Sequence, residues 1–218
     1  GGGRSQGYWD GGPGELSDAA SALDWLQIVK PDAKSCWIAG VSFGTWIAMQ
    51  LLMRRPEIDA FICVAPPANL YDFSFLAPCP ASGLIVNGDK DRVVPSPSVA
   101  ELAAKTKTQR GIKITHEVIP GANHFFEGED KLGTLKTIVG DYVDQRMLTM
   151  VEEKKAARAD RRLPKPDAKE EDDLPVADDT GGDADRLRAR GTDAVDRLQR
   201  DDRVLVVGDV DARNTSHR

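Results

Sequence analysis

The 218-residue sequence lacks any apolar stretch of the roughly 18 to 20 residues that a helix needs to cross a bilayer. Its first residues also lack the pattern of a secretory signal peptide. Basic residues are interspersed with acidic ones and form no long run of one sign, unlike the sequence of a nucleic-acid-binding surface. We therefore expect a soluble protein of the cytoplasm, with neither a membrane nor a nucleic acid among its partners.

Cysteine is scarce, and Cys36, Cys63 and Cys79 lack the spacing of a metal site. The first two lie inside apolar runs, which indicates buried, reduced thiols in a reducing compartment. The glycine-rich segment 1–15 lacks the lysine and hydroxyl of a phosphate-binding loop, and no strand precedes it in this sequence. The sequence thus predicts neither a bound metal nor a cofactor.

Charge is distributed unevenly along the chain. Residues 151–218 hold 33 charged residues in 68 positions and no aromatic residue, whereas the preceding 150 positions hold 31 charged residues. Segments rich in charge and poor in large apolar residues bury too little surface to fold. We expect a folded domain over 1–150 and a charged, largely disordered tail over 151–218.

Within 1–150, short apolar segments alternate with amphipathic helical patterns. Strands are predicted at 36–40, 60–65, 83–87 and 112–119, and helices at 17–29, from about 44 to before Pro56, at 98–106 and at 132–147. Ser17 is the expected N-cap of the first helix. This alternation predicts an α/β fold with a mostly parallel sheet flanked by helices. Ligands of such sheets sit beyond the carboxyl ends of the strands.

The segment 40–44 reads Gly-Val-Ser-Phe-Gly and lies where a strand passes into a helix. This G-x-S-x-G pattern is typical of a tight turn that lifts the hydroxyl of its serine, here Ser42, above the sheet. A serine hydroxyl is a weak nucleophile unless a base accepts its proton. Ser42 is thus the candidate nucleophile, although an ordinary turn serine has the same local pattern.

The sequence has three histidines as candidate bases. His217 stands in a polar terminus where ends usually fray, and His116 lies inside the fourth predicted strand, where a structural role is expected. His124 follows that strand in the loop 120–124, at the edge where ligands bind. We therefore expect His124 to be the general base.

A serine–histidine pair also needs a carboxylate that orients the imidazole. Asp89 and Asp91 both follow the third predicted strand, and spacing alone does not choose between them. In either case the order along the chain is serine, acid, histidine. This is the order expected of α/β-hydrolases.

Segments 40–44, 88–95 and 121–124 resemble the three catalytic motifs of the α/β-hydrolase superfamily. Segment 3–7 is similar to the glycine-rich segment after the fourth strand of small bacterial hydrolases, in the dienelactone hydrolase and peptidase-like groups. The resemblance covers about 1–150, and its G-x-x-D-x-x-V-P pattern places the acid at Asp91. It also implies that one oxyanion donor is the backbone N–H of Phe43. The family's first strands, and the loop that carries the second donor, are expected before Gly1.

The function expected from this resemblance is hydrolysis of a small ester, thioester or amide through an acyl-enzyme, with a small-molecule substrate as partner. Only about 17 residues separate the second and third strands, too few for an inserted lid domain, so an open pocket is expected. Apolar residues of that connection and of the histidine loop are candidates for the pocket wall or for the core: Tyr71, Phe73, Phe75, Leu76, Phe125 and Phe126. The alternative function is a non-catalytic fragment or binding module that retains Ser42, Asp91 and His124.

Overall fold

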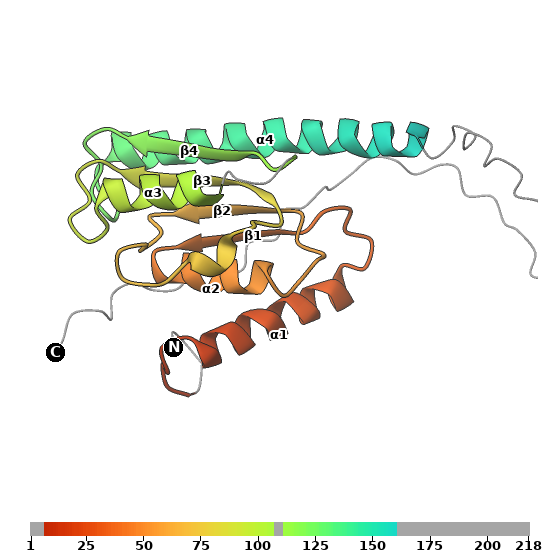
Figure 1. Cartoon of the computed structure of the whole chain (residues 1–218), viewed down its shortest axis with the longest axis horizontal. Helices are drawn as coiled ribbons and strands as arrows, with labels where there is room; N and C mark the ends of the chain where they lie inside the picture. Colours follow the sequence, from red (N-terminus) through yellow and green to blue (C-terminus); the bar gives the residue numbers. More distant parts are fainter. Residues whose placement is uncertain (1–6, 107–110, 161–218) are drawn as a thin grey trace, which may run out of the picture. The chain divides into compact units, whose positions relative to one another are not determined.

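The structure is a computed structural model that describes residues 7–106 and 111–160. Its elements follow one another in the order α1 (Pro13–Val29), β1 (Trp37–Val41), α2 (Phe43–Leu52), β2 (Ala60–Val64), η1 (Ser74–Leu76), β3 (Ser82–Gly88), α3 (Ser96–Thr106), β4 (Ile114–Ile119) and α4 (Glu129–Asp160) (Figure 1). The chain divides into two compact units after Arg146, so the last part of α4 belongs to the second unit.

The strands that the structure describes form one parallel sheet in the order β1-β2-β3-β4. One register row runs from Ile38 through Phe61 and Gly83 to Ile114. Because all four strands run the same way, their carboxyl ends meet at one edge of the sheet. The α/β fold predicted from the alternating pattern is confirmed, and this edge carries the loops expected to hold the site.

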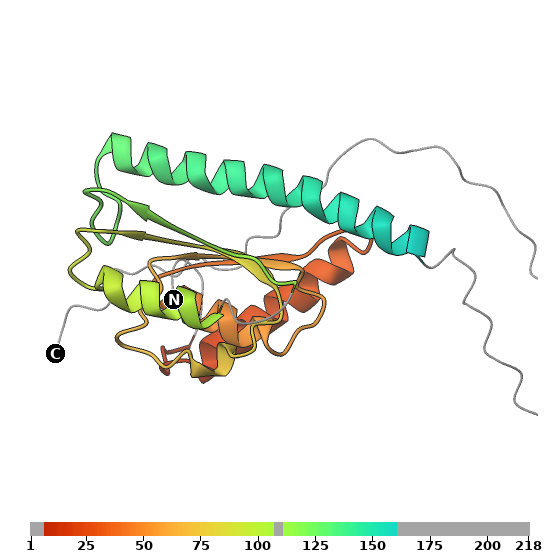
Figure 2. The same cartoon turned by 45° about the horizontal axis from the view of Figure 1, so that its top comes forward.

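Helices cover both faces of the sheet (Figure 2). On one face α2 and α3 pack against the strands, and α1 packs on α2. On the opposite face the first part of α4 approaches β1, where the rings of Trp37 and Tyr142 meet edge to face at 6.2 Å. The middle strands β2 and β3 are fully buried, which explains why they read as continuous apolar runs, whereas β1 and β4 keep exposed residues.

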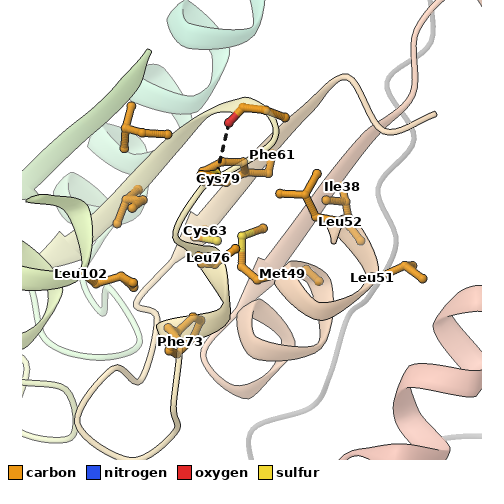
Figure 3. Close-up of a cluster of buried hydrophobic side chains, with 14 of the residues drawn as sticks. Ile38, Met49, Leu51, Leu52, Phe61, Cys63, Phe73, Leu76, Cys79 and Leu102 are labelled. Atoms are coloured by element: carbon orange, nitrogen blue, oxygen red, sulfur yellow. Dashed lines mark hydrogen bonds between the residues drawn. The ribbon is translucent and has the colours of Figure 1, made fainter. Parts of the chain in front are cut away.

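The main core lies between the sheet and α2 and α3. Figure 3 shows part of it, with Leu52 of α2 beside Ile38 of β1. Each fully buried aliphatic or aromatic side chain of this kind stabilises the fold by about 1.5–3 kcal/mol. The core also contains Cys63 and Cys79, both free thiols, and burial raises the pKa of the Cys63 thiol. Cys36 is free as well but only half-buried.

The start of α1 differs from the prediction. The helix begins at Pro13 with Gly12 as N-cap, four residues before the expected first turn at Ser17. Pro13 suits a first helical position because its missing N–H is not needed there. The carboxylate of Glu15 accepts the N–H of Gly12 at 2.8 Å, which satisfies the end of the helix without a serine cap.

The final helix is longer than predicted, because α4 continues to Asp160. Residues 151–160 were expected in the charged tail. Their charges are compatible with a helix, since Lys155 pairs with Glu152 at 3.1 Å across one turn. The remaining part of the predicted tail, 161–218, and His217 lie outside the described residues.

None of the helices in ranges 7–106 and 111–160 has both the length and the apolar character required to span a membrane.

We predict opposite effects on stability for alanine at two glycines. A Cβ at Gly83 would collide with the ring of Phe61, its buried neighbour on β2, so Gly83→Ala should lower the free energy of unfolding by about 1–3 kcal/mol. Gly140 lies on the exposed side of α4 with open space around it, so Gly140→Ala should raise that free energy by up to about 1 kcal/mol. Urea titration of both variants measures the difference, and equal effects at the two sites would contradict the packing described.

Candidate active site

Ser42 occupies a strained turn between β1 and α2. Its backbone angles are φ 49° and ψ −123°, a conformation that non-glycine residues rarely adopt and that costs on the order of 1–3 kcal/mol. The turn is held by two short contacts: the Ser42 N–H donates to the carbonyl of Val64, and Thr45 Oγ donates to the Ser42 carbonyl at 2.6 Å. A Cβ at Gly40 would collide with the backbone of Gly44 and Thr45, which explains the small residue two positions before the serine.

His124 connects Ser42 to Asp91. Its Nε2 lies 3.0 Å from Ser42 Oγ, and its Nδ1 lies 2.7 Å from Asp91 Oδ2. A carboxylate only accepts hydrogen bonds, so Nδ1 carries the proton of the neutral ring and Nε2 is left to accept the serine hydroxyl. The structure thus brings together the three residues that the motifs single out, from loops that follow β1, β3 and β4.

The carboxylate of Asp91 is fully buried and both of its oxygens are bonded. While Oδ2 faces His124, Oδ1 accepts the backbone N–H groups of Val93 and Val94, each at 2.8 Å. These bonds fix the carboxylate in the plane it needs to orient the imidazole. The side chain of His124 is 7% exposed, so this hydrogen bond is shielded from water.

Asp89, the other aspartate considered, has a different partner. Its Oδ1 accepts the backbone N–H of Gly121 at 2.5 Å, in the loop that carries His124. The backbone N–H of Lys90 donates to the carbonyl of Ala122 at 3.0 Å, which ties the same two loops together a second time. The two aspartates therefore have different roles. Asp91 hydrogen-bonds the imidazole, and Asp89 stabilises the loop that carries His124.

The histidine loop is also braced from within. Asn123 Oδ1 accepts the backbone N–H groups of Phe125 and Glu127, and its Nδ2 donates to the Glu127 carboxylate at 2.6 Å. Such local bonds from an asparagine side chain stabilise a turn that the backbone alone would not hold. His124 is thus fixed by bonds on both sides of it in the sequence.

Phe43 is the first residue of α2. The N–H groups of a helix's first turn have no acceptor within the helix, and the helix dipole favours negative charge at that end. The N–H of Phe43 is therefore available beside Ser42 for a developing oxyanion, which is the donor that the resemblance implies.

The predicted wall residues fall into two groups. Phe125 is 57% exposed with its ring edge-on to His124 at 5.1 Å, and the ring of Tyr71 lies 5.4 Å from that of Phe43. The others pack in the interior or against it, which was the alternative expected for them: Phe73, Leu76 and Phe126 are buried, and Phe75 is half-buried against the core. The connection 65–81 between β2 and β3 carries the short turn η1 and no inserted domain.

Two aromatic residues beside Phe43 belong to none of the sequence motifs. Trp9 and Trp46 both contact the Phe43 ring, at 6.2 and 5.9 Å. Trp46 follows Phe43 by three positions on α2, and this spacing places side chains on one helix face, so it was a usable signal. Trp9 had no such signal, because its contact joins a loop to a distant helix.

The other histidine in the part of the chain that the structure describes, His116, has a hydrogen-bond partner outside the Ser42–His124–Asp91 group. His116 lies on β4, where its Nε2 is 2.8 Å from Oδ1 of the buried Asn87. This agrees with the structural role expected for it. Within the described residues no cluster of three or more histidine, cysteine or acidic side chains is arranged to hold a metal ion.

Comparisons with known proteins identify the family and the fold. Residues 1–118 match the family described as X-Pro dipeptidyl-peptidase (S15 family). A putative α/β-hydrolase from Agrobacterium tumefaciens, a protein of unknown function with a crystal structure, is 62% identical with a TM-score of 0.65, over 67% of this chain and 66% of that one. An α/β serine hydrolase without a lid from Xanthomonas campestris is 30% identical with a TM-score of 0.58, over 66% and 62% of the two chains.

An uncharacterized protein of Rickettsia prowazekii is 53% identical over 128 residues, which are 57% of this chain and 54% of that protein. The chain thus spans about half the length of this relative and just under two thirds of the two crystallised ones. The family match covers more than half of the chain, and the solved structures share its fold. The chain therefore belongs to the α/β-hydrolase superfamily and, within it, to the family described as X-Pro dipeptidyl-peptidase (S15 family).

Proposed function

We propose that the protein is a serine hydrolase that cleaves a small ester, thioester or amide through an acyl-enzyme. The observation that carries this proposal is the hydrogen-bonded series from Ser42 Oγ through His124 to Asp91, with distances of 3.0 and 2.7 Å. The similarity to an α/β serine hydrolase from Xanthomonas campestris supports the same class. No cofactor or metal is required for this chemistry.

In the proposed reaction, Ser42 Oγ attacks the carbonyl carbon of the substrate while His124 Nε2 takes the hydroxyl proton. The negative charge that develops on the carbonyl oxygen is stabilised by the N–H of Phe43. His124 then returns its proton to the leaving group as the carbon–leaving-group bond breaks, which leaves an ester on Ser42. A water molecule, deprotonated by His124, releases the acid and restores the serine.

The strain at Ser42 supports this role. Backbone conformations that cost free energy persist where the surrounding structure enforces them, and they cluster at functional sites. Two hydrogen bonds hold Ser42 in this conformation: its N–H donates to the carbonyl of Val64, and its carbonyl accepts from the hydroxyl of Thr45. A serine in an ordinary turn has no need of such a conformation. This observation favours a catalytic site over the alternative of a binding module.

A second candidate within the same class is cleavage of X-Pro peptides, which the description of the matching family favours. The two candidates differ in the leaving group and in the acyl part that the pocket must accept. Comparison of kcat/KM for 4-nitrophenyl acetate and for glycyl-proline 4-nitroanilide separates them. Turnover of the anilide at a rate that matches or exceeds that of the ester would favour the peptidase.

Removal of the nucleophile should abolish the proposed activity. Ser42→Ala removes the only atom proposed to form a bond with the substrate, so turnover of 4-nitrophenyl acetate should fall to the rate of the solution reaction. Ser96→Ala is the matched control, because Ser96 lies at the start of α3 and its hydroxyl accepts from Asn87. Unchanged turnover in Ser42→Ala would rule out the proposed mechanism.

The two aspartates should differ in their effect on turnover. Asp91→Asn places an amide against Nδ1 and favours the ring tautomer that cannot accept the Ser42 proton, so kcat should fall by roughly 10³–10⁴-fold. Asp89→Asn keeps an oxygen that accepts the Gly121 N–H, so kcat should stay within a few-fold of the wild-type value. A larger loss in Asp89→Asn than in Asp91→Asn would reverse the assignment.

A further inference from the structure

Four aromatic side chains form a connected group beside the candidate nucleophile. We call Trp9, Phe43, Trp46 and Tyr71 the aromatic cluster. Phe43 is its centre: its ring lies 6.2 Å from that of Trp9, 5.9 Å from Trp46 and 5.4 Å from Tyr71, while Trp46 and Tyr71 are 4.9 Å apart. Since Phe43 directly follows Ser42, the cluster begins one residue from the serine.

The rings of the aromatic cluster are held in place by specific contacts. Trp46 donates from Nε1 to the carbonyl of Asp72 at 3.0 Å, which fixes its ring against the connection that carries Tyr71. A Cβ at Gly12 would lie 2.6 Å from the Trp46 ring, so the N-terminal loop packs on it with no room for a side chain. Three separate segments of the chain thus hold the rings in place.

The rings are nevertheless accessible to a ligand. Trp9 is 65% exposed, and Phe43, Trp46 and Tyr71 are half-buried, with Trp46 and Tyr71 also packing against the core. Clustered aromatic surface that stays in contact with water is unusual on a folded protein and marks binding sites. Pockets for small molecules combine such apolar walls with a few polar groups.

The cluster and the histidine come from different elements of the fold, although the connection after β2 that carries Tyr71 lies between them in strand order. His124 and Asp91 come from the loops after β4 and β3, whereas Phe43 and Trp46 belong to α2, which follows β1 at the opposite edge of the sheet. During acyl transfer the leaving group must face the histidine, because it takes the proton from Nε2. The carbonyl oxygen faces the Phe43 N–H, and the acyl chain, which points away from the histidine, is left to lie against the rings around Phe43.

Two carboxylates stand next to the cluster in sequence, and both are engaged with the backbone. Asp10 accepts the N–H of Gly14 at 2.9 Å, and Asp72 accepts the N–H and the hydroxyl of Ser74 at 2.8 Å. These bonds lower the pKa of both carboxyl groups. Both carboxylates therefore stay ionised next to the rings, so a cation is the competing ligand that the binding measurement must exclude.

From these observations we infer that the aromatic cluster is the acyl-binding subsite, and that it selects carboxylic acid derivatives whose acyl part carries a planar aromatic ring. This inference rests on the proposed function, because it takes Ser42 as the nucleophile. An aromatic acyl group stacks on the exposed rings in the offset or edge-to-face geometries that aromatic pairs adopt. The same group stays on Ser42 after the leaving group departs, so the cluster acts on acylation and on deacylation.

The kinetic test compares 4-nitrophenyl phenylacetate with 4-nitrophenyl acetate, which share a leaving group. The wild-type ratio of their kcat/KM values, after correction for solution reactivity, should be roughly tenfold or more in favour of the aromatic acyl group. Trp9→Ala and Tyr71→Ala should each lower that ratio several-fold. Trp25→Ala is the matched control, because Trp25 is 60% exposed on α1, and it should leave the ratio unchanged.

A binding measurement tests the same inference without turnover. The chain has four tryptophans, and ¹⁹F NMR of the 5-fluorotryptophan-labelled protein reports on each. The product phenylacetate should shift the signals of Trp9 and Trp46, while those of Trp25 and of Trp37, which packs on Tyr142, should stay in place. Acetate should shift none, and the cationic acid trimethylglycine should shift none.

Failure of the proposed hydrolase function and failure of the acyl-binding subsite would give different results. Shifts at Trp9 and Trp46 without turnover of either ester would contradict the proposed function and support only the binding of aromatic acids by the cluster. Turnover of both esters with equal efficiency, and no shift at Trp9 or Trp46, would overturn the subsite alone. Shifts with trimethylglycine but not with phenylacetate would overturn the choice of a neutral aromatic group.

Discussion

The hydrogen bond between His124 Nδ1 and Asp91 Oδ2 is the interaction on which the site depends, because it decides which imidazole nitrogen faces Ser42. A 2.7 Å bond between two loops requires that both loops be held to within a few tenths of an ångström. Parallel strands provide this, since β3 and β4 pair along their whole length and release their loops at the same edge. A Cβ at Gly88 would collide with the carbonyl of Ala122, so the two loops touch where they leave the sheet.

The same edge explains the division of the surface around Ser42. The loops after β3 and β4 carry Asp91 and His124, while the helix after β1 carries the N–H of Phe43 and the rings of Phe43 and Trp46. Trp9 and Tyr71 complete the aromatic cluster from the loop before α1 and the connection after β2. A substrate carbonyl that lies over Ser42 therefore meets proton chemistry on one side and apolar rings on the other. The exposed ring of Phe125, edge-on to His124, lies on the leaving-group side. We expect the two halves of a substrate to be recognised by different parts of the fold.

Much of this arrangement could be predicted from the sequence, because buried strands leave continuous apolar runs and the loops after them carry Ser42, Asp91 and His124. Spacing could not assign the roles of Asp89 and Asp91, because both follow β3. Only the direction of each side chain decides whether it contacts the imidazole or the backbone of the histidine loop. The contact of Trp9 with Phe43 joins segments distant in sequence and leaves no local pattern. The end of α4 was missed because charged residues such as Glu152 and Lys155 suit a solvated helix as well as a disordered tail.

The central claim is that Ser42 is a nucleophile activated by His124. Treatment of the folded chain with a fluorophosphonate, followed by mass spectrometry of its peptides, tests this most directly. Attack by Ser42 Oγ displaces fluoride and leaves a stable phosphonate ester, so we predict one adduct per chain, on the peptide that contains Ser42. The adduct should be absent after His124→Ala. A folded chain that forms no adduct, or forms it on another serine, would contradict the account.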